Sequence, residues 1–168
     1  MFLRFLIVAC AICANVSGYS TFYEWFVSTT DEVPSLKLVK FGNKSYYIHS
    51  DFKASYYKAT QFCNYHGMRL VSVMSNSEND FLHKEITEIG FSFWTSGTVD
   101  GVDQWTWMSN GRQILSYKNW NIGEPNNWDE KCLEILAIGK WNSLDCYKSR
   151  YFICEAPNIE TKNSGCKI

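Results

Sequence analysis

The 168-residue sequence predicts one α+β domain with short extensions. Three observations favour this fold class. Two stretches with helical periodicity come first, short aromatic and β-branched runs separated by Gly and Asn turns follow, and the composition is 46% hydrophobic and 17% aromatic. Such a chain can bury a sizeable core and is not expected to be disordered.

The first 18 residues, MFLRFLIVACAICANVSG, form an apolar run with one basic residue and small residues at its end. This pattern is typical of a secretory signal peptide and is too short for a membrane span, although a buried first strand is the alternative. We expect cleavage after Gly18 and a secreted, extracellular chain without membrane insertion. Residues 19–37 are then a short lead-in, residues 38–156 the domain, and residues 157–168 a C-terminal tail.

The domain is expected to open with a hairpin over residues 38–50, LVKFGNKSYYIHS, because two apolar runs flank a Gly-Asn turn. A helix is predicted over residues 54–66, with Gly67 as a left-handed stop. Its apolar face comprises Tyr56, Ala59, Phe62 and Cys63.

A second helix is predicted within SNSENDFLHKEITEIG, residues 75–90. Ser77 and Asp80 resemble a capping box, and Gly90 ends the helix. The expected buried face comprises Phe81, Leu82, Glu85, Ile86 and Ile89.

The remainder of the domain predicts strands. The segments are FSFWTSG, QWTWMSNG, ILSYKNW, CLEILAIGKWNSLDC and SRYFICEA, with a hairpin turn near Gly139. The tryptophans in these segments are interpreted as core or near-core residues: Trp94, Trp105, Trp107, Trp120 and Trp141.

Charge and composition exclude several classes of partner. The formal net charge is −1 and no basic stripe is visible, so we expect no nucleic acid partner. The three histidines are scattered and no paired-cysteine pattern accompanies them, so no zinc site is expected. Asn43, Lys44 and Ser45 form an N-glycosylation sequon on the expected turn.

Removal of the signal peptide would take Cys10 and Cys13 with it. The five cysteines that remain are Cys63, Cys132, Cys146, Cys154 and Cys166. In an oxidising compartment four of them should pair, and any four cysteines allow about three connectivities.

Two segments concentrate acids and side-chain amides. Residues 123–132 read GEPNNWDEKC and residues 141–146 read WNSLDC. A disulfide between Cys132 and Cys146 would bring these segments together. Carboxylate and amide oxygens are the ligands that Ca²⁺ prefers, at about six to eight per ion. A metal or polyol site and an ordinary polar loop both remain open on this pattern alone.

The chain resembles a secreted single-domain C-type lectin of the short arthropod form, over about residues 38–155. The motifs that carry the resemblance are QFCNYHG, FWTSG, NWNIGEPNN, CLEI, KWN and YFICE. The resemblance implies disulfides Cys63–Cys154 and Cys132–Cys146. It also implies a cis peptide before Pro125 and a long-loop region from about Thr98 to Lys131.

The resemblance further implies one calcium site that also binds sugar. Its carried-over ligands, which would bind two neighbouring sugar hydroxyls as well as Ca²⁺, are Glu124, Asn126, Glu130 and Asn142. The Glu-Pro-Asn triplet is the type that binds mannose, fucose and N-acetylglucosamine, so glycans or glycoproteins are the expected partners.

The sequence departs from the family at Ser143, where an Asp is usual. The carbonyl of Ser143 could still bind the ion, but two carboxylates replace three, and fewer charged ligands weaken calcium binding. Asp145 lies two residues further along an extended chain, roughly 6.5 Å away, and should miss the ion. Asp129, beside Glu130, is the better candidate for compensation.

The loop before Cys132 is also shorter than in many mannose-binding relatives. Asn127 and Lys131 stand where an accessory calcium site would need acids, so that second site is expected to be absent. Trp128 would stack on an apolar sugar face if exposed; the alternative is that it packs against the base of the loop.

The leading interpretation is therefore calcium-dependent carbohydrate binding. The alternative is a lectin-like domain that needs no calcium and binds protein or glycan through another surface. A glycosidase would need two carboxyls about 5 to 10 Å apart across a cleft, and no cleft or Ser/His/Asp order is visible, so we expect no enzyme. Cys166 is the odd cysteine, which suggests an intermolecular bridge and a homodimer, or a capped thiol.

Overall fold

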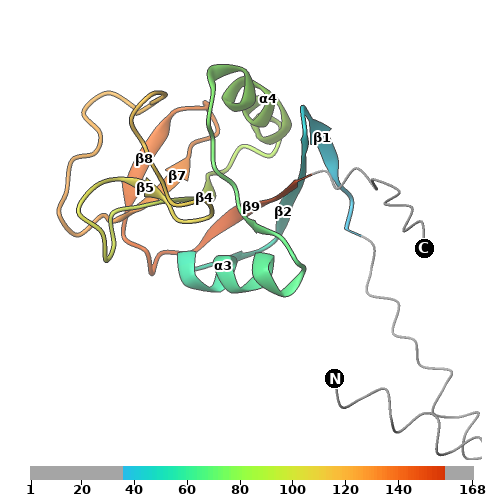
Figure 1. The fold of residues 1–168 in the computed structure, drawn as a ribbon, viewed down its shortest axis with the longest axis horizontal. Helices are drawn as coiled ribbons and strands as arrows, with labels where there is room; N and C mark the ends of the chain where they lie inside the picture. Colours follow the sequence, from blue (N-terminus) through green and yellow to red (C-terminus); the bar gives the residue numbers. More distant parts are fainter. Residues whose placement is uncertain (1–35, 158–168) are drawn as a thin grey trace, which may run out of the picture. The chain divides into compact units, whose positions relative to one another are not determined.

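The structure is a computed structural model that describes residues 36–157 (Figure 1). The predicted signal peptide, residues 19–35 of the lead-in, residues 158–168 of the tail and Cys166 lie outside the described residues. Within the described range, none of the helices combines the length and the apolar character that crossing a membrane requires.

The predicted α+β class and the opening hairpin are confirmed. β1 (Val39–Phe41) and β2 (Lys44–Ala54) pair in antiparallel fashion around a turn in which Gly42 has φ 57°. Two helices follow, α3 (Tyr56–Tyr65) and α4 (Asn76–Thr87). The other strands are β3 (Arg69–Leu70), β4 (Phe93–Thr98), β5 (Thr106–Trp107), β6 (Arg112–Gln113), β7 (Cys132–Ile135), β8 (Trp141–Leu144) and β9 (Arg150–Pro157).

Helix α3 begins two residues later than predicted, because Ala54 still belongs to β2 and Ser55 is the N-cap. Its predicted apolar face is confirmed: Tyr56, Ala59 and Cys63 are buried and Phe62 packs beside them. Gly67 has φ 67°, as expected for a left-handed stop.

The predicted cap of α4 is wrong. Ser75, not Ser77, is the N-cap, and its Oγ accepts a hydrogen bond from the backbone N–H of Glu78 at 3.2 Å. Asp80 instead accepts from the Asn76 side chain at 2.7 Å. Of the predicted buried face, Leu82 and Ile86 are buried, whereas Phe81, Glu85 and Ile89 are only half-buried. Glu78 and Asn79, which were not predicted, are buried as well.

The strands form one sheet in the order β1-β2-β9-β4-β5-β6, with β7 joining β4 to β8 and β3 beside β9. The strand predicted over residues 114–120 is wrong: only Trp120 forms an isolated bridge, to Trp141. The short β3 was not predicted.

Alternate residues of the central strands face two separate clusters, because successive side chains of a strand point to opposite faces. Phe93 joins one cluster and Trp94 the other; Ile153 and Cys154 divide in the same way. We call the first the α4 cluster: Tyr46, Val71, Val73, Leu82, Ile86, Phe93, Trp107, Ile114, Leu133, Ile135, Trp141 and Ile153. The second is the α3 cluster: Ala54, Tyr56, Ala59, Cys63, Met68, Leu70, Trp94, Cys132, Cys146, Phe152 and Cys154.

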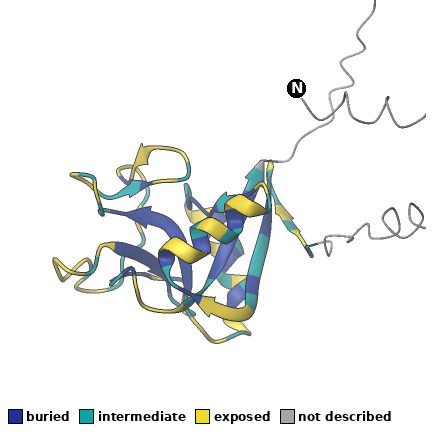
Figure 2. Ribbon diagram, turned by 90° about the horizontal axis from the view of Figure 1, so that it is seen from below, coloured by how far each residue is buried: buried dark blue, intermediate teal, exposed yellow. Residues whose placement is uncertain are grey.

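Each helix therefore covers its own cluster, and Figure 1 shows α3 and α4 on opposite sides of β2 and β9. Most of the central strands are buried, whereas the helices keep an exposed face (Figure 2). The interpretation of the tryptophans is confirmed: Trp94, Trp107 and Trp141 are buried, and Trp105 and Trp120 pack against the α4 cluster.

The two disulfides implied by the resemblance are both present. Cys63–Cys154 joins α3 to β9, and Cys132–Cys146 joins the start of β7 to the turn that follows β8. The second bond holds together the two polar segments identified in the sequence.

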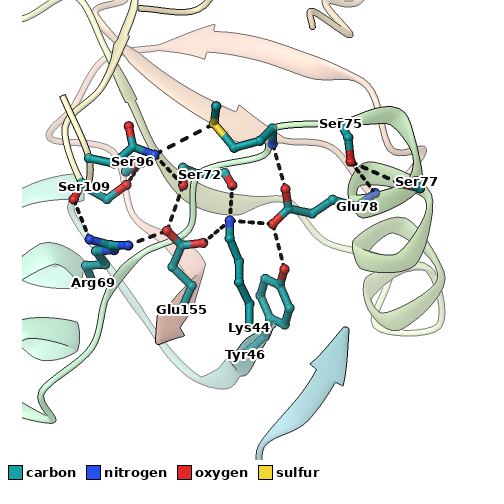
Figure 3. Close-up of polar contacts among 12 residues, drawn as sticks. Lys44, Tyr46, Arg69, Ser72, Ser75, Ser77, Glu78, Ser96, Ser109 and Glu155 are labelled. Carbon is teal, nitrogen blue, oxygen red and sulfur yellow. Dashed lines mark hydrogen bonds and ion pairs between the residues drawn. The ribbon is translucent and has the colours of Figure 1, made fainter. Parts of the chain in front are cut away.

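A largely buried polar network ties β2 to α4 and β9 (Figure 3). The ammonium group of Lys44 donates to Glu78 at 2.8 Å, to Glu155 at 2.7 Å and to the carbonyl of Ser72 at 3.0 Å. The carboxylate of Glu78 also accepts from the hydroxyl of Tyr46 at 2.6 Å. The side chains of Glu78 and Glu155 are 6% and 1% exposed, so Lys44 neutralises two buried carboxylates.

His49 lies within a group of aromatic rings. Its ring is 4.3 Å from that of Phe152, centroid to centroid, and is in contact with Phe52 and Phe62. Nδ1 is 3.2 Å from the Tyr47 hydroxyl, and buried Nε2 has no hydrogen-bond partner among residues 36–157.

Acidification should therefore destabilise the fold through His49. Burial lowers the pKa of His49 below its ordinary value; the nearby Asp51 carboxylate, 4.0 Å away, acts in the opposite direction and His66 in the same one. Below the ordinary pKa of histidine the unfolded chain then binds more protons than the folded one. The free energy of unfolding is therefore unaffected by His49 above about pH 6.5 and decreases as the pH falls below that value. Urea unfolding at pH 7 and pH 5 should show a larger loss for the wild type than for His49→Phe. Equal losses of stability in the two proteins would show that His49 is not the cause.

Candidate functional site

The Glu-Pro-Asn triplet lies in the long loop between β6 and β7, where the chain reverses at a cis peptide bond between Glu124 and Pro125. Gly123 precedes it with φ 85°, and the backbone N–H of Glu124 donates to the carbonyl of Asn121 at 3.0 Å. The Asn126 side-chain amide donates to Glu124 Oε1. The cis bond implied by the resemblance is therefore present, and the first and third residues of the triplet are in contact.

Ser143 is the centre of the predicted constellation. Its Oγ is 2.7 Å from Glu124 Oε2 and 3.2 Å from Glu130 Oε2, and its backbone N–H donates to Glu124 Oε2 at 3.2 Å. The residue is fully buried. The position where the resemblance implies a third carboxylate thus carries a hydroxyl group that faces the carboxylates of Glu124 and Glu130.

The sheet brings Ser143 to this place. β7 and β8 pair in antiparallel register, with Leu133 opposite Ser143 and Glu134 opposite Asn142. The Cys132–Cys146 disulfide fixes the end of this strand pair at which Cys132 lies opposite Leu144, next to Ser143. Glu130, two residues before Cys132, is therefore held beside β8.

Asn142 joins the same constellation through the backbone. Its side-chain N–H group donates to the carbonyl of Ser143 at 2.7 Å and to Glu134 Oε1 at 3.0 Å. All five residues predicted to bind the metal therefore lie in one connected set of hydrogen bonds: Glu124, Asn126, Glu130, Asn142 and Ser143.

The neighbouring acids do not join this set. Asp145 Oδ1 accepts from the backbone N–H of Tyr147 at 3.0 Å, so its carboxylate caps its own turn. The Asp129 carboxylate makes no hydrogen bond or ion pair within the described part of the chain; its backbone N–H donates to Asn127 Oδ1. The Lys131 ammonium is 3.7 Å from Asp100.

Trp128 is 95% exposed, which decides between its two interpretations: it does not pack against the base of the loop. Ile122, at the other end of the triplet, is 99% exposed. Two apolar side chains that reach into solvent therefore flank the triplet in sequence.

Sequence reasoning missed Glu134 and Arg150. Glu134 is buried in β7, and its Oε2 accepts from Arg150 Nε at 2.5 Å while its Oε1 accepts from Asn142. The signal was present in CLEI, because a charged residue within a buried strand is rare unless it is paired.

The constellation contains the kind of oxygen ligand that a hard cation prefers, but only two of its groups are carboxylates. One carboxylate oxygen of Glu124 and one of Glu130 lie within 3.2 Å of the single atom Ser143 Oγ, and Ca²⁺ prefers oxygen ligands. No group of three or more His, Cys, Asp or Glu residues placed to hold a metal occurs in residues 36–157. Glu124 and Glu130 are the two charged groups that a Ca²⁺ ion could use here, and amide and backbone oxygens would have to complete its coordination.

Comparison with known families gives a match over most of the described chain. The family model for the lectin C-type domain matches residues 52–156. Perlucin from Haliotis laevigata is 32% identical over 128 residues, which cover 72% of this chain and 82% of perlucin. Human C-type lectin domain family 4 member K is 33% identical over 130 residues, which cover 73% of this chain but only 39% of that protein.

Among solved structures, the C-type carbohydrate-recognition domain of cow CD23 has a similar fold. It was solved in the presence of a GlcNAc2Man3 oligosaccharide, and it matches with a TM-score of 0.64 and 31% identity. The match covers 71% of this chain and 92% of that domain.

Proposed function

Because the chain belongs to the C-type lectin domain family, we propose that it binds carbohydrate in a calcium-dependent manner. When bound, Ca²⁺ accepts oxygen ligands from the protein and from sugar hydroxyls together, so it links the two. The residues that would hold it are Glu124, Asn126, Glu130, Asn142 and Ser143.

One observation carries this proposal: Glu124 and Glu130, from separate parts of the loop, converge on Ser143 in β8. The Glu-Pro-Asn triplet favours mannose, fucose and N-acetylglucosamine, and the sugar present with the cow CD23 domain is of a related kind. Exposed Trp128 would stack on an apolar face of the sugar.

The second candidate is lectin-like binding without calcium. It is favoured by a specific observation: Ser143 and Asn126 already donate hydrogen bonds to the Glu124 carboxylate, so protein groups satisfy it without an ion. In that case the ligand, protein or glycan, would bind through another surface.

Binding to immobilised mannose and galactose separates the two candidates. Retention on mannose in Ca²⁺, with release by a chelator, supports the calcium-dependent function. Retention that a chelator does not change supports the second candidate, and turnover of a glycoside would be required to consider an enzyme.

Replacement of Ser143 by Asp should tighten calcium binding about tenfold or more, because it restores a third carboxylate at the centre of the site. Without Ca²⁺ the same change should lower the midpoint of thermal unfolding, since three carboxylates held close together would then repel one another. Calorimetric titration and thermal unfolding with and without Ca²⁺ measure both effects.

Ser143→Asn, which has the same shape as the Asp variant but no charge, is the matched control and should change calcium affinity less than about threefold. Equal affinities of the Asp and Asn variants would contradict the role given to charge.

The remaining proposals concern the mature protein. We propose that it is secreted, glycosylated at Asn43 and able to form a homodimer through Cys166, with glycans or glycoproteins as partners. Asn43 is exposed in the turn between β1 and β2, where an oligosaccharide can be accommodated. Dimerisation would strengthen weak single-site binding by avidity, and migration at monomer size on a non-reducing gel would count against it.

A further inference from the structure

Glu134 is a buried carboxylate beside the candidate site that none of the ligand assignments uses. It lies in β7, is 2% exposed, and contacts two hydrogen-bond donors. Arg150 Nε donates to Oε2 at 2.5 Å, and Asn142 Nδ2 donates to Oε1 at 3.0 Å. The carboxylate therefore links the guanidinium group of Arg150 in β9 to Asn142, a proposed metal ligand in β8.

These contacts fix the orientation of the Asn142 carboxamide. A carboxylate and a carbonyl can only accept hydrogen bonds, so the nitrogen of Asn142 must face Glu134 and the Ser143 carbonyl. Both side-chain N–H bonds are then used. The remaining polar atom is Oδ1, which accepts no hydrogen bond from any residue in the described range.

We propose that Glu134, itself held by Arg150, is a positioning residue that keeps Asn142 Oδ1 available as a metal ligand. The proposal rests on the calcium-dependent function. Glu134 does not contact the ion; it determines which atom of Asn142 does. Groups that orient a metal ligand in this way commonly change metal affinity by about ten- to a hundredfold when replaced.

Glu134→Gln is an informative substitution because it preserves shape while changing one acceptor into a donor. Arg150 can only donate, so the oxygen of the new carboxamide must face Arg150 and its NH₂ group must face Asn142. Two NH₂ groups cannot satisfy each other. Asn142 must therefore turn its oxygen toward position 134 and away from the site, and it loses its hydrogen bond to the Ser143 carbonyl.

A second substitution should reverse this effect. In Glu134→Gln/Arg150→Met, no cation competes for the oxygen of the new carboxamide. That oxygen can accept from Asn142 again, and the original orientation returns. The control is Glu155→Gln, which also neutralises a buried, ion-paired carboxylate, but in the network around Lys44.

The test is calcium titration of the four proteins by calorimetry, with thermal unfolding in chelator as the measure of fold. We expect Glu134→Gln to lose about ten- to a hundredfold in calcium affinity, the double variant to recover most of it, and Glu155→Gln to lose stability without losing affinity. Wild-type affinity in Glu134→Gln, an equal loss in Glu155→Gln, or no recovery in the double variant would each overturn the proposal. If the wild type binds no Ca²⁺, the proposed function fails first, and the positioning role fails with it.

A further measurement needs no substitution. In the wild type, the side-chain NH₂ signals of Asn142 should be protected from hydrogen exchange and should shift when Ca²⁺ is added. Exchange at the rate of a free amide, or signals unmoved by saturating Ca²⁺, would overturn the positioning role.

Discussion

Lys44→Met is expected to lower the free energy of unfolding by about 3 kcal/mol, the low end of the cost of breaking a buried ion pair. The change leaves the carboxylates of Glu78 and Glu155 without the ammonium group that lies 2.8 Å and 2.7 Å from them. Arg69 Nε, 3.4 Å from Glu155, still offsets part of the loss. Urea unfolding at pH 7 with both disulfides intact measures the difference.

Two comparisons show whether this loss comes from the buried carboxylates. Lys40→Met removes an exposed ammonium group from neighbouring β1 and should change the free energy of unfolding by less than about 0.5 kcal/mol. Glu78→Gln should cost clearly less in the Lys44→Met background than in the wild type, because one uncompensated charge has been removed. Strict additivity of the two substitutions would show that they do not interact.

Glu130→Gln is expected to weaken calcium-dependent binding to mannose by about a hundredfold or more. The substitution removes one of the two carboxylates that converge on Ser143. A pair of unit charges 4 Å apart contributes about 4 kcal/mol at the effective dielectric near a protein surface, and about 1.4 kcal/mol corresponds to a factor of ten. Calorimetry with Ca²⁺ measures the loss of calcium affinity, and retention on immobilised mannose measures the loss of sugar binding.

The adjacent residue provides a matched control. Asp129→Asn makes the same change in net charge in the same loop, but the Asp129 carboxylate makes no hydrogen bond or ion pair among residues 36–157. We expect less than about a threefold effect. A loss as large as that of Glu130→Gln would instead identify Asp129 as the compensating ligand that the sequence suggested.

The helices could be predicted because their periodicity and stop signals are local, but the cap of α4 was assigned to the wrong serine. Ser75 and Ser77 are each followed three residues later by an acid, and only Ser75, followed by Glu78, matches the consensus capping box with Glu or Gln. What the sequence does not show is that the Glu78 carboxylate contacts Lys44 and Tyr46 in β2. That contact is distant in sequence.

The strand predicted over residues 114–120 failed for a similar reason. Its aromatic residues do have the composition of a strand, but they serve packing instead. The rings of Tyr117 and Trp120 lie 5.4 Å and 5.9 Å from that of Trp141, centroid to centroid. The backbone of this segment bonds to Trp141 only at its end, where Trp141 N donates to the Asn119 carbonyl.

The resemblance supplied the candidate site, but not the residues that orient it. Glu124, Asn126 and Glu130 could be named as candidate ligands from motif order alone. Glu134 required the register of β7 against β8 and the nearness of Arg150 in β9, and neither follows from spacing along the chain.

The two faces of the sheet are secured by different chemistry. All four bonded cysteines belong to the α3 cluster, whereas the α4 cluster, as far as the described residues go, contains none. The order of assembly during oxidative folding should reflect this division. The α4 face can pack while the thiols are still reduced, and the α3 face gains its full stability only as the bonds close. Because Cys132–Cys146 is among those bonds, the loop that carries Glu130 should reach its final structure only after the α4 face has packed.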